Sequence, residues 1–217
     1  MIKMSGTSLV IGSTGLIGKK LIFELAKKNS EVIAITRRSI SNLPENVDLL
    51  DINFDDFLKN GSLPSCDHIY ICLGTTIKKA GSQSEFKKVD FDYCISFARK
   101  AREAGATKIS LVSSVGANPY TKNFYLKTKG KLENEIKTMG FDSVNIFQPG
   151  LLLGNRDEIR PLEFLGQYGS YLLNMTLLGP AKKYRSIDAK RVAQTMANTA
   201  DIAGVHYFTY EDFLGVQ

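Results

Sequence analysis

A glycine-rich turn near the start of the chain constrains its fold more than any other feature. The apolar run Ser8–Ile11 leads directly into Gly12-Ser13-Thr14-Gly15-Leu16-Ile17-Gly18, a GxxGxxG turn that opens an amphipathic stretch. In such a strand–turn–helix unit the first glycine permits a tight turn, and the second lets the backbone approach a pyrophosphate. The third lets the helix pack closely on the sheet. Free N–H groups at the start of the helix favour a phosphate. We therefore predict that this turn binds a dinucleotide.

The rest of the chain alternates short β-branched runs with longer amphipathic stretches. The expected strands are Ser8–Ile11, Glu31–Thr36, Val47–Asp51, His68–Leu73, Lys108–Ser113, Ser143–Phe147 and Val205–Phe208. The expected helices are Leu16–Lys28, Glu85–Ala104, Phe124–Met139 and Ala189–Ala200. This alternation is typical of βαβ units on a parallel sheet, and the apolar central runs require helices on both faces. We predict one Rossmann-type, doubly wound α/β domain over residues 1–217, with 151–185 as a small substrate-side lobe.

Composition narrows the classes of protein that this chain can belong to. Its 217 residues suit one sizeable domain, and 43% apolar with 23% charged residues is ordinary for a globular protein. The net charge of +6 is scattered, which favours a polyanionic cofactor over nucleic acid. No stretch is long enough to span a bilayer, and no targeting peptide is visible. Three cysteines without a CxxC pair suit a reducing compartment and argue against a metal site. We expect a cytoplasmic location.

The end of the second expected strand indicates which dinucleotide binds. A site selective for NAD carries Asp or Glu there, to accept hydrogen bonds from the ribose hydroxyls. Here the strand EVIAIT ends in Arg37 and Arg38 instead. Guanidinium groups pair with phosphate in a bidentate manner and suit the 2′-phosphate of NADP(H). We therefore expect NADP(H) in preference to NAD(H).

A candidate for chemistry lies in the third expected helix and the strand before it. Tyr125 and Lys129 are four residues apart, so they share one face of a helix. An ammonium beside a phenol makes the phenol more acidic, which lets it act as a general acid or base nearer neutral pH. Upstream, Ser113 and Ser114 end a strand at the edge of the sheet where α/β ligands bind. This combination favours proton transfer at a bound substrate.

These motifs together resemble a known superfamily. The matching stretches are GSTGLIG, TRR, CLGTTIKKAGS, VDFDY, LVSSVGA, FYLKTKGKLE, FQPGLLLGNRDEIRP and IDAKRVA, which cover nearly the whole chain. The sequence resembles atypical or extended short-chain dehydrogenases/reductases. Within them it is most similar to the Tat-interacting-protein-like NAD(P)-binding oxidoreductases.

The resemblance implies roles for individual residues. Ser114 and Tyr125 would polarise the substrate carbonyl or alcohol, with Ser113 as the alternative serine, and Lys129 would also hold the nicotinamide ribose. Other implied cofactor contacts are Leu73, Gly74 and Thr75 on the adenosine-ribose side, Asp51 at the adenine, and Pro149, Gly150 and Leu151 beside the nicotinamide. One position departs from the family pattern. Many relatives carry an Asn in the helix after the fourth strand, and Asp90 is the best match here.

Two functions of different class stay open at this stage. The first is an NADP(H)-dependent oxidoreductase that acts on a small carbonyl or alcohol. The second is a non-catalytic NADP(H)-binding regulator that acts through a protein partner, and a nucleotide-sugar epimerase is a weaker third. The charged stretch from Arg156 to Glu163 is either a solvated loop or the substrate entrance, and His68 and His206 are expected to be structural. The substrate and a homodimeric state are not specified by the sequence.

Overall fold

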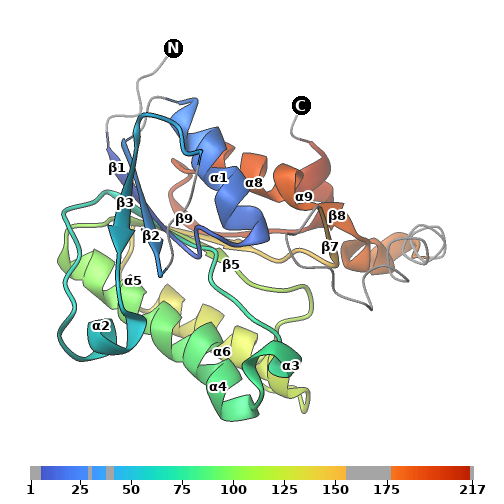
Figure 1. Cartoon of the computed structure of the whole chain (residues 1–217). Coiled ribbons are helices and arrows are strands. Elements are labelled where there is room, and N and C mark those ends of the chain that lie inside the picture. Colours follow the sequence, from blue (N-terminus) through green and yellow to red (C-terminus); the bar gives the residue numbers. More distant parts are fainter. Residues whose placement is uncertain (1–5, 29–30, 38–41, 155–176, 216–217) are drawn as a thin grey trace.

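Parallel strands form one continuous sheet at the centre of the molecule (Figure 1). The computed structural model describes residues 6–28, 31–37, 42–154 and 177–215. Within them the sheet has the order β3-β2-β1-β4-β5-β6-β9. The strands are β1 Thr7–Ile11, β2 Glu31–Thr36, β3 Val47–Asp51, β4 His68–Ile71, β5 Lys108–Val112, β6 Ser143–Phe147 and β9 Gly204–Phe208. The order reverses between β1 and β4, where doubly wound sheets bind ligands at the carboxyl ends of their strands. The predicted Rossmann-type fold class is confirmed.

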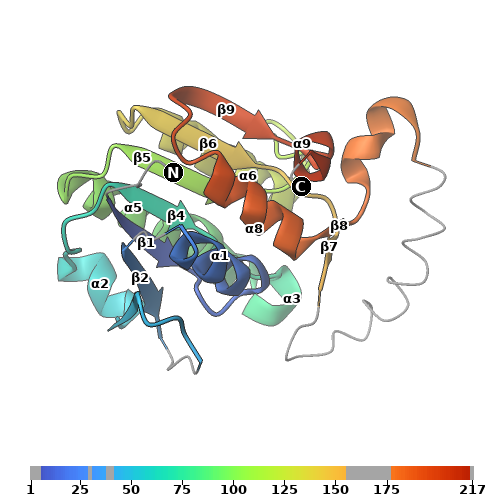
Figure 2. The ribbon, with the colours of Figure 1, turned by 90° about the horizontal axis from the view of Figure 1, so that it is seen from above.

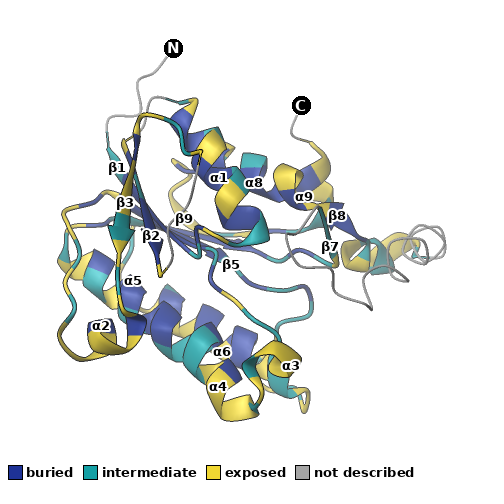
Figure 3. Cartoon of the chain, in the orientation of Figure 1, coloured by how far each residue is buried: buried dark blue, intermediate teal, exposed yellow. Residues whose placement is uncertain are grey.

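Helices cover both faces of the sheet, as the apolar strands require. The helices α1 Leu16–Ala26, α8 Ala189–Asn198 and α9 Tyr210–Leu214 lie on one face. The helices α2 Phe54–Asn60, α5 Cys94–Glu103 and α6 Phe124–Lys137 lie on the other (Figure 1). Seen from above, α1 and α8 run side by side (Figure 2). Along β1, Leu9 and Ile11 pack toward α5 while Val10 packs toward α1, so both faces are buried (Figure 3).

One predicted helix is divided in the structure. Instead of a single helix over Glu85–Ala104, the chain forms α4 Gln83–Lys87, the π-helical turn η1 Lys88–Tyr93, and then α5. A π-helical turn carries one extra residue, and such turns are frequent at functional sites. Here it includes Asp90, whose side chain is completely buried. The regular 3.6-residue pattern of the sequence therefore hid a local change of pitch.

The remaining differences concern ends and short elements. The strands β4 and β5 end before Leu73 and Ser113, which therefore lie in the connections that follow. Short elements that the sequence pattern did not predict are α2, α3 Ile77–Ala80, β7 Leu152–Leu153, η2 Gly179–Tyr184, β8 Ile187–Asp188 and α9. They are too brief for periodicity to identify. Of the expected lobe over 151–185, residues 155–176 lie outside the described residues, and so does the charged stretch from Arg156 to Glu163.

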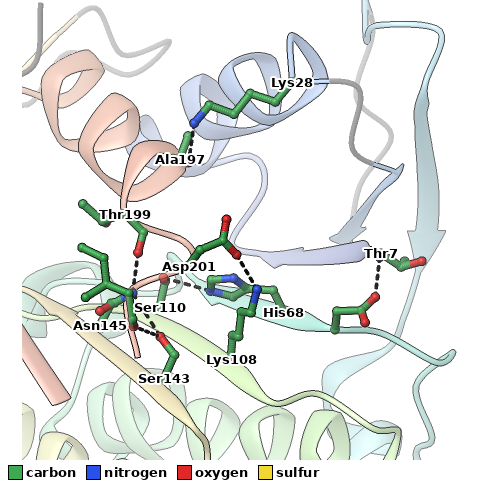
Figure 4. Close-up of polar contacts among 12 residues, drawn as sticks. Thr7, Lys28, His68, Lys108, Ser110, Ser143, Asn145, Ala197, Thr199 and Asp201 are labelled. Atoms are coloured by element: carbon green, nitrogen blue, oxygen red, sulfur yellow. Dashed lines mark hydrogen bonds and ion pairs between the residues drawn. The ribbon is translucent and has the colours of Figure 1, made fainter. Parts of the chain in front are cut away.

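A cluster of buried polar side chains lies at the amino end of the sheet, on the side of α8 (Figure 4). We call His68, Ser110, Ser143 and Asn145 the amino-edge cluster. The His68 Nε2 lies 3.0 Å from the Ser110 Oγ, and Asn145 donates hydrogen bonds to the Ser143 Oγ and, at 2.9 Å, to the Thr199 carbonyl. Burial, with a smaller effect of Lys108, lowers the pKa of His68 to about 3. His68 is thus neutral and far from the ligand-binding edge.

Candidate dinucleotide-binding and catalytic site

The glycine-rich turn has the geometry that its sequence predicts. Gly12 adopts a positive φ of 78°, and a Cβ added there would lie 2.5 Å from the Cys72 carbonyl carbon. A Cβ on Gly18 would lie 2.3 Å from the Gly12 carbonyl oxygen, so this glycine allows α1 to pack against the turn. A Cβ on Gly15 would meet the same oxygen at 3.1 Å, with little else near it. Gly12 and Gly18 are therefore required by packing, whereas a Cβ on Gly15 would make a single tight backbone contact.

The start of α1 is arranged to receive an anion. Gly15 is the N-cap, and within the described part of the chain no side chain caps this helix end. The first turn of α1 contains no acidic residue. The buried Ser13 hydroxyl donates a 2.7 Å hydrogen bond to the Ile35 carbonyl, which ties the turn to β2, and Thr14 is exposed. The N–H groups and the positive end of the helix dipole are thus available to a pyrophosphate.

The ends of β2 and β3 carry the residues expected near the adenosine. Arg37 is exposed directly after β2, and its guanidinium carbon lies 5.0 Å from the centre of the Phe54 ring. Such a cation–π contact holds a guanidinium in place without neutralising it. Asp51 is exposed at the end of β3, where it pairs in register with Thr36. Arg38 lies outside the described residues.

Lys129 forms a buried ion pair that the sequence did not reveal. Its Nζ lies 2.8 Å from the Asp90 Oδ1, and both side chains are almost completely buried. The other oxygen of Asp90 accepts a 2.7 Å hydrogen bond from the Thr75 N–H. A Cβ on Gly74 would lie 3.3 Å from the Asp90 Oδ1 and 3.7 Å from the Lys129 Nζ. The structure thus brings Lys129 together with the turn after β4, which was expected to contact the cofactor.

The charge of Lys129 is maintained by its surroundings. Burial alone lowers the pKa of this lysine, but the carboxylate of Asp90 raises it, with smaller contributions from Tyr125 and Cys94. The net pKa is raised, so the ammonium persists at all ordinary pH values. Tyr125 lies one turn before Lys129 on α6, half-buried, with its ring 5.5 Å from that of Phe86.

The two serines that end the fifth strand differ in their surroundings. Ser113 is buried, and its hydroxyl donates a hydrogen bond to the Glu133 carboxylate, which also accepts a 2.9 Å hydrogen bond from Gln148. Burial raises the pKa of Glu133, and these two hydrogen bonds oppose that effect. Ser114 is half-buried, and within the described part of the chain its hydroxyl donates a single, long hydrogen bond of 3.4 Å, to the Val115 carbonyl. Ser114 is therefore the serine with a hydroxyl that a substrate could engage.

Glu133 was missed at the sequence level. It lies one turn after Lys129, and these two charged residues are buried on α6 beside small or apolar residues such as Gly130 and Leu132. A charged residue on the buried face of an amphipathic helix is a recognisable signal, because burying an unpaired charge is costly. We call Asp90, Lys129, Ser113 and Glu133 the carboxyl-edge cluster.

Close backbone packing places the segment after β5 against α6. A Cβ on Gly130 would lie 2.4 Å from the backbone nitrogen of Pro119, and the Asn118 N–H donates a 3.1 Å hydrogen bond to the Leu126 carbonyl. Only glycine fits at this point of the helix. The segment that begins with Ser114 and the helix that carries Tyr125 therefore have a fixed relation.

The turn after β6 adjoins the same edge. Pro149 is buried, and its carbonyl accepts a 3.0 Å hydrogen bond from the Val115 N–H. A Cβ on Gly150 would lie 2.4 Å from the Arg185 carbonyl oxygen. Leu151 is exposed, and Leu73, after β4, is buried in the core. The residues expected beside the nicotinamide thus border the segment that contains Ser114.

The fold and this edge define a dinucleotide-binding protein of the Rossmann type. An uncapped helix start, a glycine-rich turn and a buried lysine all lie at the carboxyl ends of the central strands. The chain belongs to the NAD(P)H-binding family, whose model matches residues 12–202. A relative named HTATIP2 supports the predicted resemblance to the Tat-interacting-protein-like NAD(P)-binding proteins.

Known relatives support this placement, and a solved structure supports the fold. The chain is 32% identical to "Protein FMP52, mitochondrial" of Candida albicans, over 86% of both chains. It is 34% identical to "Protein HTATIP2" of Rattus norvegicus, over 76% of this chain and 71% of the relative. Its fold matches human epimerase family protein SDR39U1, solved with NADPH, with a TM-score of 0.65 and 19% identity. That match covers 94% of this chain and 74% of the other.

The comparison corrects one expectation. The sequence analysis expected a cytoplasmic location, from cysteine usage and the lack of a visible targeting peptide. That expectation is wrong, because the fungal relatives are named mitochondrial proteins. Among the described residues, no helix has the length and apolar composition needed to cross a membrane.

Proposed function

We propose that this protein is an NADP(H)-dependent oxidoreductase that moves hydride to or from a small carbonyl or alcohol. The observation that carries the proposal is the position of Lys129. Its ammonium is held inside the protein at the edge where α1 presents its uncapped start, and Tyr125 lies one turn away on α6. A structural role alone does not call for a buried charge at this edge, whereas proton transfer beside a bound dinucleotide does.

Each residue of the site has a distinct task in this proposal. The N–H groups at the start of α1 bind the pyrophosphate, and Gly15 leaves room for it. Arg37 and Arg38 bind the 2′-phosphate. The nicotinamide, when bound, supplies or accepts the hydride. Tyr125 donates a proton to the carbonyl oxygen of the substrate, or accepts one from the alcohol, and the Ser114 hydroxyl donates a hydrogen bond to the same oxygen.

The test is a screen for NADPH consumption over aldehydes and ketones, followed by the variant Tyr125→Phe. Removal of the phenol hydroxyl should lower kcat by about 10²–10⁴-fold, the usual contribution of a positioned acid or base. The affinity for NADPH, measured by calorimetry, should hardly change. Tyr120→Phe is the matched control, because Tyr120 is 89% exposed in the segment before α6. Full activity in Tyr125→Phe would exclude the proposed proton donor.

A second candidate function has one observation in its favour. Lys129 is already paired with Asp90, so its ammonium is not wholly available to Tyr125 or to a ribose. A non-catalytic NADP(H)-binding regulator would need only the nucleotide site. It predicts no turnover with any carbonyl, no difference between Tyr125→Phe and the wild type, and a partner affinity that changes with bound nucleotide. Turnover that depends on Tyr125 would exclude it.

A further inference from the structure

A single carboxylate joins two parts of the candidate site. Asp90 contacts Lys129 through Oδ1 and the Thr75 N–H through Oδ2, so both of its oxygens are engaged. It is 0% exposed and Lys129 is 3% exposed. A Cβ added to the adjacent Gly74 would lie 3.3 Å from the Asp90 Oδ1 and 3.7 Å from the Lys129 Nζ, so the ion pair lies directly against this glycine. Asp90 lies in the π-helical turn η1, where its chain neighbours Val89 and Phe91 pack against the apolar core. This packing holds the turn, and with it Asp90, in place.

We propose that Asp90 is the positioning residue that keeps Lys129 charged inside the protein and fixes its ammonium beside the turn at Gly74 and Thr75. Asp90 acts through these neighbours and does not itself touch nucleotide or substrate. The proposal rests on the proposed function only in its last consequence, the effect on NADPH binding. The ion pair itself can be tested without nucleotide.

The groups around Lys129 make Asp90 its principal source of negative charge. Tyr125 on α6 and Cys94 on α5 also face the ammonium but contribute less to its charge than Asp90 does, and burial raises the pKa of Cys94 to about 12. Glu133, one turn along α6, interacts with Lys129 more weakly and is engaged with Ser113 and Gln148. Without Asp90, burial would act on Lys129 almost unopposed, and its pKa would fall.

The variant Asp90→Asn tests the ion pair through the pH dependence of stability. Asn keeps an oxygen that can accept from the Thr75 N–H but removes the charge. In the variant, the pKa of Lys129 in the folded protein would fall below its value of about 10.4 in the unfolded chain. Between these two pKa values the unfolded chain binds more protons, so the free energy of unfolding should rise with pH. In the wild type the pKa is raised, and no such rise occurs in that window. The difference in urea midpoint between the two should therefore narrow from pH 6 to pH 10.

Asp92→Asn is the matched control for this experiment. Asp92 lies on the same π-helical turn and forms a 2.8 Å ion pair with Lys87, but both side chains are largely exposed. Its removal should leave a small difference that does not vary with pH. The double variant Asp90→Asn, Lys129→Met carries no buried charge at this point. Its difference in urea midpoint from the wild type should therefore not narrow as the pH rises. A purely structural hydrogen bond predicts that the difference in urea midpoint between the wild type and Asp90→Asn stays constant with pH. Such a constant difference would overturn the proposal.

NADPH binding supplies a second measurement, by calorimetry from pH 7.5 to 9.5. In Asp90→Asn the affinity should fall about tenfold for each pH unit above the lowered pKa of Lys129, as the ammonium is lost. The NADPH affinity of the wild type should not change over this pH range. A wild-type affinity that falls with pH would overturn the proposal even if Asp90→Asn fails to fold. Absence of turnover would defeat the proposed function alone, since neither the urea midpoints nor the NADPH titrations depend on it.

Discussion

The two ends of the sheet both bury polar side chains, but they differ in charge. The amino-edge cluster is neutral, and its members bond to one another and to backbone carbonyls such as that of Thr199 (Figure 4). The carboxyl-edge cluster buries the charges of Asp90 and Lys129. Neutral polar groups cost less to bury than charges do, even though the Asn145 Oδ1 has no hydrogen-bond partner among the described residues. A buried ion pair often stabilises less than apolar residues would. The comparison supports the proposal that the amino edge contributes to stability and the carboxyl edge to ligand chemistry.

The comparison predicts that a change at the carboxyl edge can abolish binding without unfolding the protein. Gly15→Val should weaken NADPH binding by at least about a hundredfold, ~2.7 kcal/mol, because the side chain enters the space for the pyrophosphate. The fold should largely persist, since Gly15 has a negative φ of −76° and the tight contact of an added Cβ, 3.1 Å from the Gly12 carbonyl oxygen, calls for a shift of only a few tenths of an ångström. Calorimetry and thermal unfolding followed by circular dichroism measure the two effects.

Gly18→Val provides the contrast within the same turn. Its Cβ would lie 2.3 Å from the Gly12 carbonyl oxygen, so this variant should lose stability as well as binding. Normal NADPH affinity in a folded Gly15→Val protein would show that the pyrophosphate does not lie above the turn.

At the amino edge the comparison predicts an effect on stability alone. The pKa of His68 is about 3 in the folded protein and about 6.5 in an unfolded chain, so the unfolded chain binds more protons between these values. Stability should therefore be lost as pH falls through this window. Replacement by Gln should reduce that slope by up to about 1.4 kcal/mol per pH unit, with unchanged NADPH binding near pH 7.

Urea unfolding at several pH values between 4 and 7 measures the slope for His68→Gln. His206→Gln is the control, because His206 is partly exposed and, within the described part of the chain, its Nε2 lies 2.8 Å from the nearby Ala203 carbonyl. An unchanged slope in His68→Gln would mean that His68 has the same pKa in the folded and unfolded chains, which would contradict its neutral state in the buried amino-edge cluster.

The sequence predicted the fold well because its signals are local and repeated. The glycines of the first turn, the apolar strands and the amphipathic helices each follow from chain-neighbour patterns, and the strand starts fall within one residue of their predicted positions. The site was harder, because its contacts join distant segments. Asp90 was noticed only as a departure from Asn, and neither its pairing with Lys129 nor the Glu133–Ser113 hydrogen bond can be inferred from spacing. The π-helical turn that buries Asp90 has no periodic signal.

The smallest expected effect concerns which dinucleotide binds at the carboxyl edge, NADPH or NADH. The double variant Arg37→Ala, Arg38→Ala should remove a preference for NADPH over NADH of at least about tenfold, ~1.4 kcal/mol. Arg37 is suited to this role because the Phe54 ring holds its guanidinium without neutralising it. Calorimetric titration of both nucleotides into wild type and variant measures the ratio.

Arg99→Ala is a control for net charge, since Arg99 is exposed on α5, away from the ends of β2 and β3. It should keep the wild-type ratio. The preference should also weaken at high salt, because exposed guanidinium–phosphate contacts are screened by ions. Equal affinities for NADPH and NADH in the wild type would refute the assignment to the 2′-phosphate. So would a double variant that keeps its preference, since the selectivity would then come from groups other than the two arginines.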